Sequence, residues 1–322
     1  MNAVLIIDKP RGLTSHDVVN RVRRILREKS VGHLGTLDPL ATGVLPLVIG
    51  NLTRLAQFYT ASEKIYEGTI RFGFSTDTYD AEGEPTSPAR AVSFSLEQVR
   101  ELATRFQGSI EQIPPPFSAK KIQGVPAYKL ARKHVEISLK PVQVEIKEFE
   151  ITQVNAHAGL DAPVRAAEQS SSGSVASFRA RVASGTYMRS VAHDMGQLLG
   201  CGAHLESLRR TAVGEFDLAD AHTLEELEEA CKTGQTEDLF IHPRKLLPQF
   251  PSVTANEEMA AHIRTGRPVN LPELSQARLV KVFTGQRELI AIATRVAGTL
   301  FHAKIVLAGA ATPRLANNDD RT

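Results

Sequence analysis

The densest set of residues able to carry out chemistry lies in the segment GHLGTLDPLATGVLP, residues 32–46. Asp38 stands there between a glycine-bearing loop and an apolar stretch, and Gly35, Pro39 and Gly43 impose an unusual backbone path. Such a loop on a rigid scaffold can aim one carboxylate into a cleft, where carboxylates act as bases or nucleophiles. An Asp-Pro turn with a local hydrogen bond accounts for the same residues. On physical grounds alone, the turn is the favoured interpretation.

A strand and a basic helix are expected before this segment. Residues 4–7 are continuously apolar and predict a buried strand. Thr14 with Asp17 forms a capping-box pattern, and the apolar residues behind it share one helical face: Val18, Val22, Ile25 and Leu26. The opposite face carries Arg21, Arg23, Arg24, Arg27 and Lys29. These cations can be solvated or can bind phosphates.

The elements expected after this segment alternate between strands and helices. Apolar runs and alternation predict strands at 44–49, 66–74, 142–154 and 175–182. Pro46 favours an edge or a bulge in the first of these strands, and a phase shift near Phe149 predicts a bulge in the third. Helices are expected from Ser95 with Gln98 to Gly108, from Tyr187 to Leu199, and from Thr223 with Glu226.

Several segments depart in composition from these regular elements. An insertion at about 110–145 has little apolar content and gathers basic residues, including Lys120, Lys121, Lys129 and Arg132. Residues 156–174 are small, polar and serine-rich, which predicts a flexible loop. A boundary is expected near 242–252, followed by a short helix around Met259 and three strands. Residues 311–322 are expected to form a disordered tail.

The overall composition limits the classes of protein to which the chain can belong. A chain of 322 residues, of which 42% are hydrophobic, can form one large domain or two unequal ones. Its net charge of +2 is too small to imply nucleic-acid binding, so any RNA surface must come from local clusters. Cys201 and Cys231 match no metal-ligand spacing, and His33 and Asp38 lack further clustered ligands, so no metal is expected. No pattern of a signal peptide or transmembrane segment is present, which predicts a soluble, cytoplasmic protein without a membrane partner.

The segment around Asp38 resembles the catalytic motif of the TruB family of tRNA pseudouridine-55 synthases. Three further segments resemble this family in the same order, namely KIY at 64–66, SGTYMRS at 184–190 and GCGAHLESLRRT at 200–211. Residues 115–121, with Gly124 and Tyr128, are similar to the family's RNA-gripping insertion. The likeness covers about residues 3–250, and the C-terminal unit resembles a PUA domain in position and size.

This resemblance implies a fold and a reaction. The fold is α+β, with a mixed, mainly antiparallel sheet, flanking helices and the basic insertion in a catalytic domain at 1–245. A small β-rich, PUA-like domain follows at 250–310. The reaction isomerises uridine-55 in the T-loop of tRNA: the N1–C1′ bond breaks, the uracil turns, and a C5–C1′ bond forms. No redox step is involved, so no cofactor is expected.

The resemblance also implies the catalytic residues. Asp38 is the carboxylate, which either attacks C1′ or removes a proton from C2′. Tyr66 lies against the uracil. Without the family motif, it would be interpreted as an ordinary aromatic residue of the core. Arg189 begins a helix, where the dipole disfavours a cation, and can form a bidentate pair with Asp38. A solvated arginine is the ordinary interpretation of that position.

Further residues are implied in binding the RNA. Tyr187 and Leu208 line the uridine pocket, although Leu208 could equally be a core residue. His33 fills the gap that the target nucleotide leaves in the T-loop when it flips out. The phosphate backbone is expected to contact basic residues of the first helix and the insertion, namely Arg21, Arg24, Lys120, Lys121, Lys129 and Arg132.

The expected partner is the T-stem-loop of tRNA, bound by a monomer that needs no other protein. Two alternatives remain. One is an RNA chaperone that folds tRNA and has a dormant site, for which the joint presence of Asp38, Tyr66 and Arg189 is unnecessary. The other is a synthase that acts on a different RNA.

Overall fold

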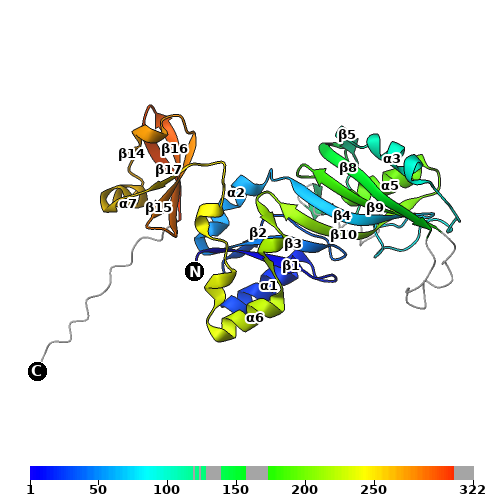
Figure 1. Ribbon diagram of the computed structural model, residues 1–322, viewed down its shortest axis with the longest axis horizontal. Coiled ribbons are helices and arrows are strands. Elements are labelled where there is room, and N and C mark those ends of the chain that lie inside the picture. The colour runs from blue at the N-terminus through cyan, green and yellow to red at the C-terminus, as the bar shows by residue number, and fades with distance from the viewer. Residues whose placement is uncertain (119, 123–124, 128–138, 157–172, 308–322) are drawn as a thin grey trace, which may run out of the picture.

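The computed structural model describes the whole chain except residues 119, 123–124, 128–138, 157–172 and 308–322. The described residues form a large sheet followed by a small one (Figure 1). Two predicted segments, the loop at 156–174 and the tail at 311–322, fall almost entirely outside this description. Within the described residues, no helix is both long and apolar enough to cross a membrane.

The large sheet is mixed and mainly antiparallel, as the resemblance implied. Its strands run in the order β12-β1-β3-β10-β4-β9-β8-β5, with β2 beside β3 and β11 beside β10. Among the described strands of this sheet, only the β1–β12 and β3–β10 pairs are parallel. The strands are β1 (Ala3–Lys9), β2 (Val31–His33), β3 (Thr42–Ile49), β4 (Lys64–Phe72), β5 (Gly108–Gln112), β8 (Val142–Ala156), β9 (Ser174–Val182), β10 (Ala203–Val213), β11 (Phe216–Asp217) and β12 (Ala221–His222). A hairpin of β6 (Lys121–Ile122) and β7 (Val125–Pro126) lies in the insertion.

The helices begin where their capping patterns predict. Capping boxes with both hydrogen bonds open α1 (Ser15–Leu26), α3 (Leu96–Thr104) and α6 (Leu224–Thr233). α5 (Met188–Leu198) starts after Tyr187, and α2 (Ala56–Tyr59) is a single turn. Short 3-10 helices occupy Gly50–Leu55, Leu218–Asp220, Thr236–Leu239, Pro243–Lys245 and Pro272–Leu274.

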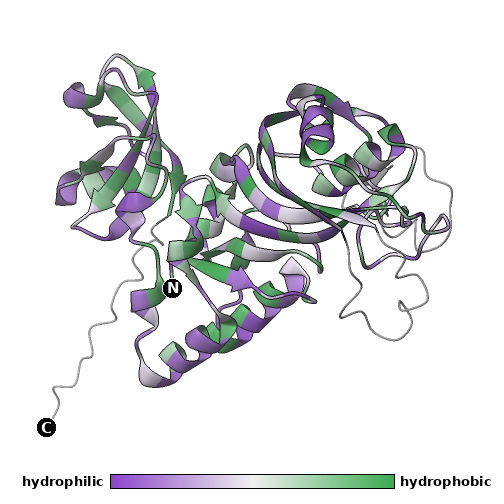
Figure 2. Cartoon of the chain, turned by 45° about the vertical axis from the view of Figure 1, so that its right-hand side comes forward, coloured by the Kyte–Doolittle hydropathy of each residue, from purple (hydrophilic) through white to green (hydrophobic). Residues whose placement is uncertain are grey.

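One face of the large sheet forms the main core with the helices. Strand β9 alternates between buried residues and exposed or half-buried ones, so that Ala176, Phe178 and Ala180 face the core. Apolar residues of α3 and α5 pack on the same face. The hydropathy colours alternate along these strands and helices, as expected of elements with one apolar side (Figure 2). The opposite face is polar along β9, whereas β1 and β3 bury a second set of apolar residues there, including Val4, Ile6, Val44 and Val48.

Strand β3 corrects the expectation that Pro46 marks an edge or a bulge. It pairs with β1 from Gly43 to Ile49 without a break in register. On its other side it meets β10 at Thr42 and Gly43, and β2 only from Leu47 onward. Between these stretches the Pro46 carbonyl accepts from the Leu34 amide. Pro46 therefore lies where no ladder donor is needed, which an interior strand can tolerate.

The small sheet follows residue 250 and packs onto the large domain. Its strand order is β13-β15-β16-β17-β14, with β13 (Ser252–Thr254), β14 (Val269–Asn270), β15 (Leu279–Thr284), β16 (Glu288–Ala297) and β17 (Leu300–Val306), and α7 (Glu257–Arg264) covers it. An apolar cluster joins Phe283, Leu289 and Ile305 of this unit to Tyr59 and Leu247. The small unit is thus held by a shared core as well as by the chain.

Candidate active site

Asp38 stands at a cavity of about 280 Å³ whose lining brings together four segments that are distant in sequence. The lining includes four of the other residues implicated by sequence, Tyr66, Tyr187, Arg189 and Leu208. Tyr66 comes from β4, Leu208 from β10, and the other two from the start of α5. The Asp38 side chain remains 41% exposed, so a substrate can reach it.

The loop that carries Asp38 is held by buried donors on both sides. The Ser15 hydroxyl at the start of α1 bonds to both the amide (2.8 Å) and the carbonyl (3.1 Å) of Leu37. The Pro39 carbonyl accepts from the Gly12 amide (2.8 Å) and from Nζ of Lys9 (3.4 Å). Lys9 has no exposed surface. The backbone on either side of the carboxylate is therefore fixed before substrate binds.

Arg210 of β10 holds the preceding part of the same loop. Its side chain has no exposed surface and donates to the carbonyls of Gly35 (3.0 Å), Thr36 (3.3 Å) and Val44 (2.8 Å). Gly43 allows the close approach of the two strands, because a Cβ there would lie 2.2 Å from the Arg210 carbonyl oxygen. This buried cation thus attaches the Asp38 loop to the centre of the sheet.

Arg189 pairs with Asp38, although not in the two-point manner that sequence suggested. Its Nη2 lies 2.9 Å from Oδ2 of Asp38 and also donates to the Phe117 carbonyl (3.0 Å). Its Nη1 instead donates to the Thr78 carbonyl (3.2 Å). The guanidinium is 6% exposed, so its contacts fix its direction. Arg189 therefore joins the Asp38 loop to the insertion and to the loop after β4.

A second carboxylate, Asp80, lies near the other terminal nitrogen of the Arg189 guanidinium. Its Oδ2 lies 3.7 Å from Nη1 of Arg189, and its side chain is 6% exposed. Its Oδ1 accepts from the Thr78 hydroxyl (2.7 Å) and the Glu82 amide (3.0 Å). One buried arginine thus pairs with two carboxylates, of which only Asp38 is open to a ligand.

The remaining cavity residues are positioned by the sheet and by one buried amide. Tyr66 is 8% exposed and lies opposite Arg210 in the β4–β10 register. The buried Gln112 side chain bonds to both the amide (2.8 Å) and the carbonyl (3.0 Å) of Tyr187. Burial raises the pKa of Tyr187, so its phenol stays protonated at neutral pH. The cavity thus offers an aromatic ring and a neutral phenol beside an exposed carboxylate.

Two lysines near the site are shifted by burial. Burial lowers the pKa of Lys64, which lines the cavity, to about 8, and the positive charge of Arg210 adds to the shift. Burial likewise lowers the pKa of Lys9 to about 8, although the charges of Glu82 and Asp38 oppose the shift. Both amines therefore lose part of their charge just above neutral pH.

The other described residues that the sequence implicated do not line this cavity. His33 ends β2, accepts from the Gly35 amide (3.4 Å), and does not line the cavity. Arg21 pairs with Glu225 and Glu228 of α6 at 3.0 and 2.9 Å, so its charge is already balanced. Arg24 is exposed and Lys120 is half-buried. Lys121 belongs to β6, while Lys129 and Arg132 lie outside the described residues.

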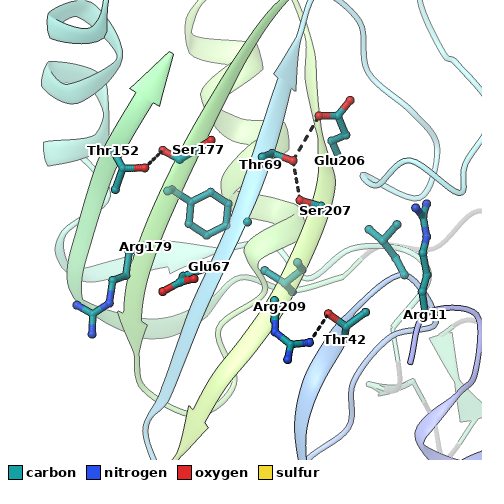
Figure 3. A pocket seen from close by; sticks show the side chains of 14 residues that line it. Arg11, Thr42, Glu67, Thr69, Thr152, Ser177, Arg179, Glu206, Ser207 and Arg209 are labelled. Carbon is teal, nitrogen blue, oxygen red and sulfur yellow. Dashed lines mark hydrogen bonds between the residues drawn. The ribbon is translucent and has the colours of Figure 1, made fainter. Parts of the chain in front are cut away.

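A larger cavity, of about 540 Å³, lies on the polar face of the large sheet (Figure 3). Cross-strand register places Arg209, Glu67, Arg179 and Glu150 in one row of alternating charge. Arg209 is further paired with Asp8 at 2.7 Å. Opposite charges in such a row balance one another and keep an uncovered sheet face hydrated. The smaller cavity, with its exposed carboxylate and buried cations, is the better site for chemistry.

This geometry suits substitution or proton transfer at a sugar carbon beside a flat ring. Asp38 is the exposed carboxylate, Arg189 fixes it, and Tyr66 and Leu208 provide apolar surface for a base. Sequence reasoning missed Lys9, Asp80 and Arg210. Lys9 stands in the segment KPRG at 9–12 and Arg210 in the segment GCGAHLESLRRT at 200–211, but only burial distinguishes them from surface cations.

Comparison with known families identifies the class of protein to which this fold belongs, that of the pseudouridylate synthases. Residues 23–188 match the TruB family pseudouridylate synthase (N terminal domain), and residues 189–247 match the tRNA pseudouridylate synthase B C-terminal domain. The chain belongs to the TruB family of pseudouridylate synthases. The family resemblance predicted from sequence is confirmed.

Individual relatives extend this result over nearly the whole chain. A tRNA pseudouridine synthase B from Solibacter usitatus is 49% identical over 95% of this chain and 100% of its own length. One from Geobacter sulfurreducens is 38% identical over 83% of each chain. The structure of a Cbf5-Nop10-Gar1 complex contains a chain with a TM-score of 0.67 and 24% identity, over 95% of this chain and 85% of that one. That likeness supports the α+β fold with a second, C-terminal β unit.

Proposed function

We propose that this protein converts uridine-55 in the T-loop of tRNA to pseudouridine. The observation that carries the proposal is the Asp38–Arg189 pair at 2.9 Å, at the edge of a cavity that holds Tyr66, Tyr187 and Leu208. Family membership supplies the class of reaction, and relatives such as the Solibacter usitatus protein are named for tRNA.

The proposed reaction replaces the N1–C1′ bond of uridine with a C5–C1′ bond and transfers a proton from C5 to N1. Asp38 acts at the ribose, either by attack on C1′ or by removal of the C2′ proton, and the N1–C1′ bond breaks. The detached uracil turns over while the cavity keeps it close. C5 then bonds to C1′, the proton on C5 is lost, and N1 gains a proton. The product has the composition of the substrate, so the reaction consumes no oxidant or reductant and we propose that it needs no cofactor.

The other cavity residues hold the base during this rearrangement. We assign Tyr66 to the face of the uracil, with Leu208 and Tyr187 closing the pocket around it. Arg189 directs the Asp38 carboxylate toward the sugar, and its own direction is fixed by Thr78 and Phe117. We retain His33 as a group that acts on the T-loop outside the cavity, since it ends β2 directly before the loop that carries Asp38.

The RNA must present a flipped nucleotide, since a stacked uridine cannot turn in place. We assign backbone contacts to the exposed Arg24 and to the insertion, including Lys120, Lys121, Lys129 and Arg132. Arg21 is a weaker candidate because Glu225 and Glu228 neutralise it. We divide the chain into a catalytic domain at 1–245 and an RNA-binding, PUA-like domain at 250–310.

The two alternatives make different demands on the site. A tRNA-folding chaperone needs a basic surface, but it gains nothing from a buried arginine that holds an exposed carboxylate at 2.9 Å. A synthase for another RNA would use the same cavity and differ only in the RNA surface. We propose a monomer that acts without an obligatory protein partner.

The test incubates the purified full chain with an unmodified tRNA transcript and maps pseudouridine by chemical labelling and primer extension. We expect modification at position 55 alone, and none in a transcript that carries cytidine there. An RNA-annealing assay on the same preparation tests the chaperone alternative. Absence of pseudouridine, or its formation elsewhere in the transcript, would contradict the proposal.

A further inference from the structure

Helix α5 presents two functional side chains to one short segment of the loop after β4. Arg189 and His193 are separated by one helical turn and so lie on the same side of α5. The segment Thr78–Asp80 lies against both of these side chains. Thr78 and Asp80 contact Arg189, while the ring of Tyr79 stacks on His193 with centroids 3.7 Å apart and an interplanar angle of 12°.

The backbone at Tyr79 is in an unusual conformation that fixes the direction of its ring. Its φ of +65° lies in the left-handed region, where a bulky residue is rarely found. Its amide donates to the Thr76 carbonyl (3.3 Å), and its carbonyl accepts from the Leu205 amide (3.0 Å). A strained residue of this kind persists only when its surroundings hold it, and such residues gather at functional sites.

The contact between the two rings is that of a neutral pair. Burial lowers the pKa of His193 and raises the pKa of Tyr79, so both rings are uncharged at neutral pH. Nδ1 of His193 is buried and has no hydrogen-bond partner within the described residues. Ring-on-ring packing is therefore the contact by which His193 holds the loop.

We propose that the Tyr79–His193 stack is a positioning device for the catalytic pair. It holds the Thr78–Asp80 segment against α5, so that the Thr78 carbonyl and the Asp80 carboxylate fix Arg189. Arg189 in turn fixes Asp38. Neither ring lines the cavity that holds Asp38, so both act at a distance from the substrate. This inference rests on the proposed function.

The stack could instead contribute only to stability, and the two roles predict different measurements. A stabilising contact changes the unfolding transition and leaves the rate of the folded enzyme unchanged. A positioning contact lowers the single-turnover rate at saturating RNA while the affinity for RNA is kept. It also acts partly through Asp80, so its loss costs less once Asp80 no longer carries a charge.

The experiment compares Tyr79→Ala and His193→Ala with the wild-type full chain in single-turnover assays at saturating tRNA. We expect each to lower the rate roughly three- to tenfold, with the dissociation constant for RNA within about twofold. The double variant should be no slower than either single variant, because both remove the same contact. Tyr79→Phe should recover most of the rate lost in Tyr79→Ala, since it keeps the ring.

Two controls make the result decisive. Gln197→Ala, at an exposed position of the same helix, should leave the rate unchanged. In an Asp80→Asn background, Tyr79→Ala should cause a smaller fold loss than it causes in the wild-type protein. His193→Leu, which fills space without a flat ring, replaces His193→Ala if that variant does not fold.

Rates within twofold of wild type in folded Tyr79→Ala and His193→Ala would overturn the inference, as would losses that multiply in the double variant. An inactive wild-type protein would instead refute the proposed function.

Discussion

Two adjacent arginines of β10 should respond very differently to the same substitution. Arg210 is fully buried and donates to three carbonyls, two of which belong to the loop that carries Asp38. The Arg209 side chain is 40% exposed and pairs with Asp8 at the surface. Replacement by methionine keeps much of the apolar stem in each case and removes the guanidinium.

The expected magnitudes follow from these contacts. Hydrogen bonds that involve a charged group contribute about 1.5–3 kcal/mol each, so three contribute ~5–9 kcal/mol before the cost of burying the charge is subtracted. Burial of the guanidinium offsets several kcal/mol of this sum, and we expect a net loss of about 3–5 kcal/mol for Arg210→Met. Arg209→Met loses one partly exposed ion pair, which contributes about 0–1 kcal/mol.

The assay measures the free energy of unfolding in urea and the single-turnover rate at saturating tRNA. Arg210→Met should be destabilised by the larger amount, and its folded fraction should react at least roughly tenfold more slowly, because the Asp38 loop has lost its attachment. Arg209→Met serves as the matched control. Equal destabilisation of the two variants, or a wild-type rate in folded Arg210→Met, would refute the role assigned to Arg210.

Three other residues give independent tests. Asp80→Asn keeps the shape of the side chain but removes a charge beside Arg189, so the single-turnover rate should fall roughly 10- to 100-fold with RNA affinity retained; an unchanged rate would contradict the two-carboxylate arrangement. Burial lowers the pKa of Lys64 from 10.5 to about 8, so between these pH values the unfolded state binds more protons than the folded state does. The free energy of unfolding of the wild-type protein should therefore rise with pH through that window. Lys64→Met should show a smaller rise, and identical slopes in urea titrations would contradict this. Gly43→Ala places a Cβ 2.2 Å from a backbone oxygen, whereas Gly12→Ala meets nothing within 4 Å; both have positive φ, so the second should cost about 1–2 kcal/mol and the first clearly more. Equal losses in thermal unfolding would show that β3 can move away from β10.

Helix starts were the most predictable part of the fold, because they depend on residues close in sequence, whereas the predicted end of α3 at Gly108 was wrong: the helix ends at Thr104 and Gly108 begins β5. The pairs Thr14–Asp17 and Thr223–Glu226 each form a full capping box and begin their helices as predicted. The shift of phase near Phe149 likewise corresponds to irregular register between β8 and β9.

The central strand β10 was not predicted as a strand, although part of it was recognised as a motif. Its alternation is interrupted by shifts of register between Leu205 and Ser207 and between Arg210 and Ala212. Its charged residues also face both sides of the sheet, since Arg210 is buried and Arg209 is not. A period of two is therefore hard to recognise in the sequence alone.

The site was predictable in its main residues only through the family resemblance. Asp38 and Arg189 belong to segments far apart in sequence, and elementary patterns favoured a turn for one and a solvated position for the other. Lys9 and Arg210 were missed because lysine and arginine are ordinarily exposed, and only the fold reveals that backbone carbonyls surround them. Asp80 was missed because it stands in a polar loop whose folded path depends on β10.

The most direct test of the account is the single-turnover rate of Asp38→Asn on tRNA. The amide can act neither as a nucleophile nor as a base, so the rate should fall by at least roughly a thousandfold while the dissociation constant for RNA stays within a few-fold of wild type. Asp238→Asn, the same change at an exposed position, should behave as wild type. Turnover by pure Asp38→Asn within tenfold of wild type would contradict the assignment of Asp38 as the catalytic carboxylate.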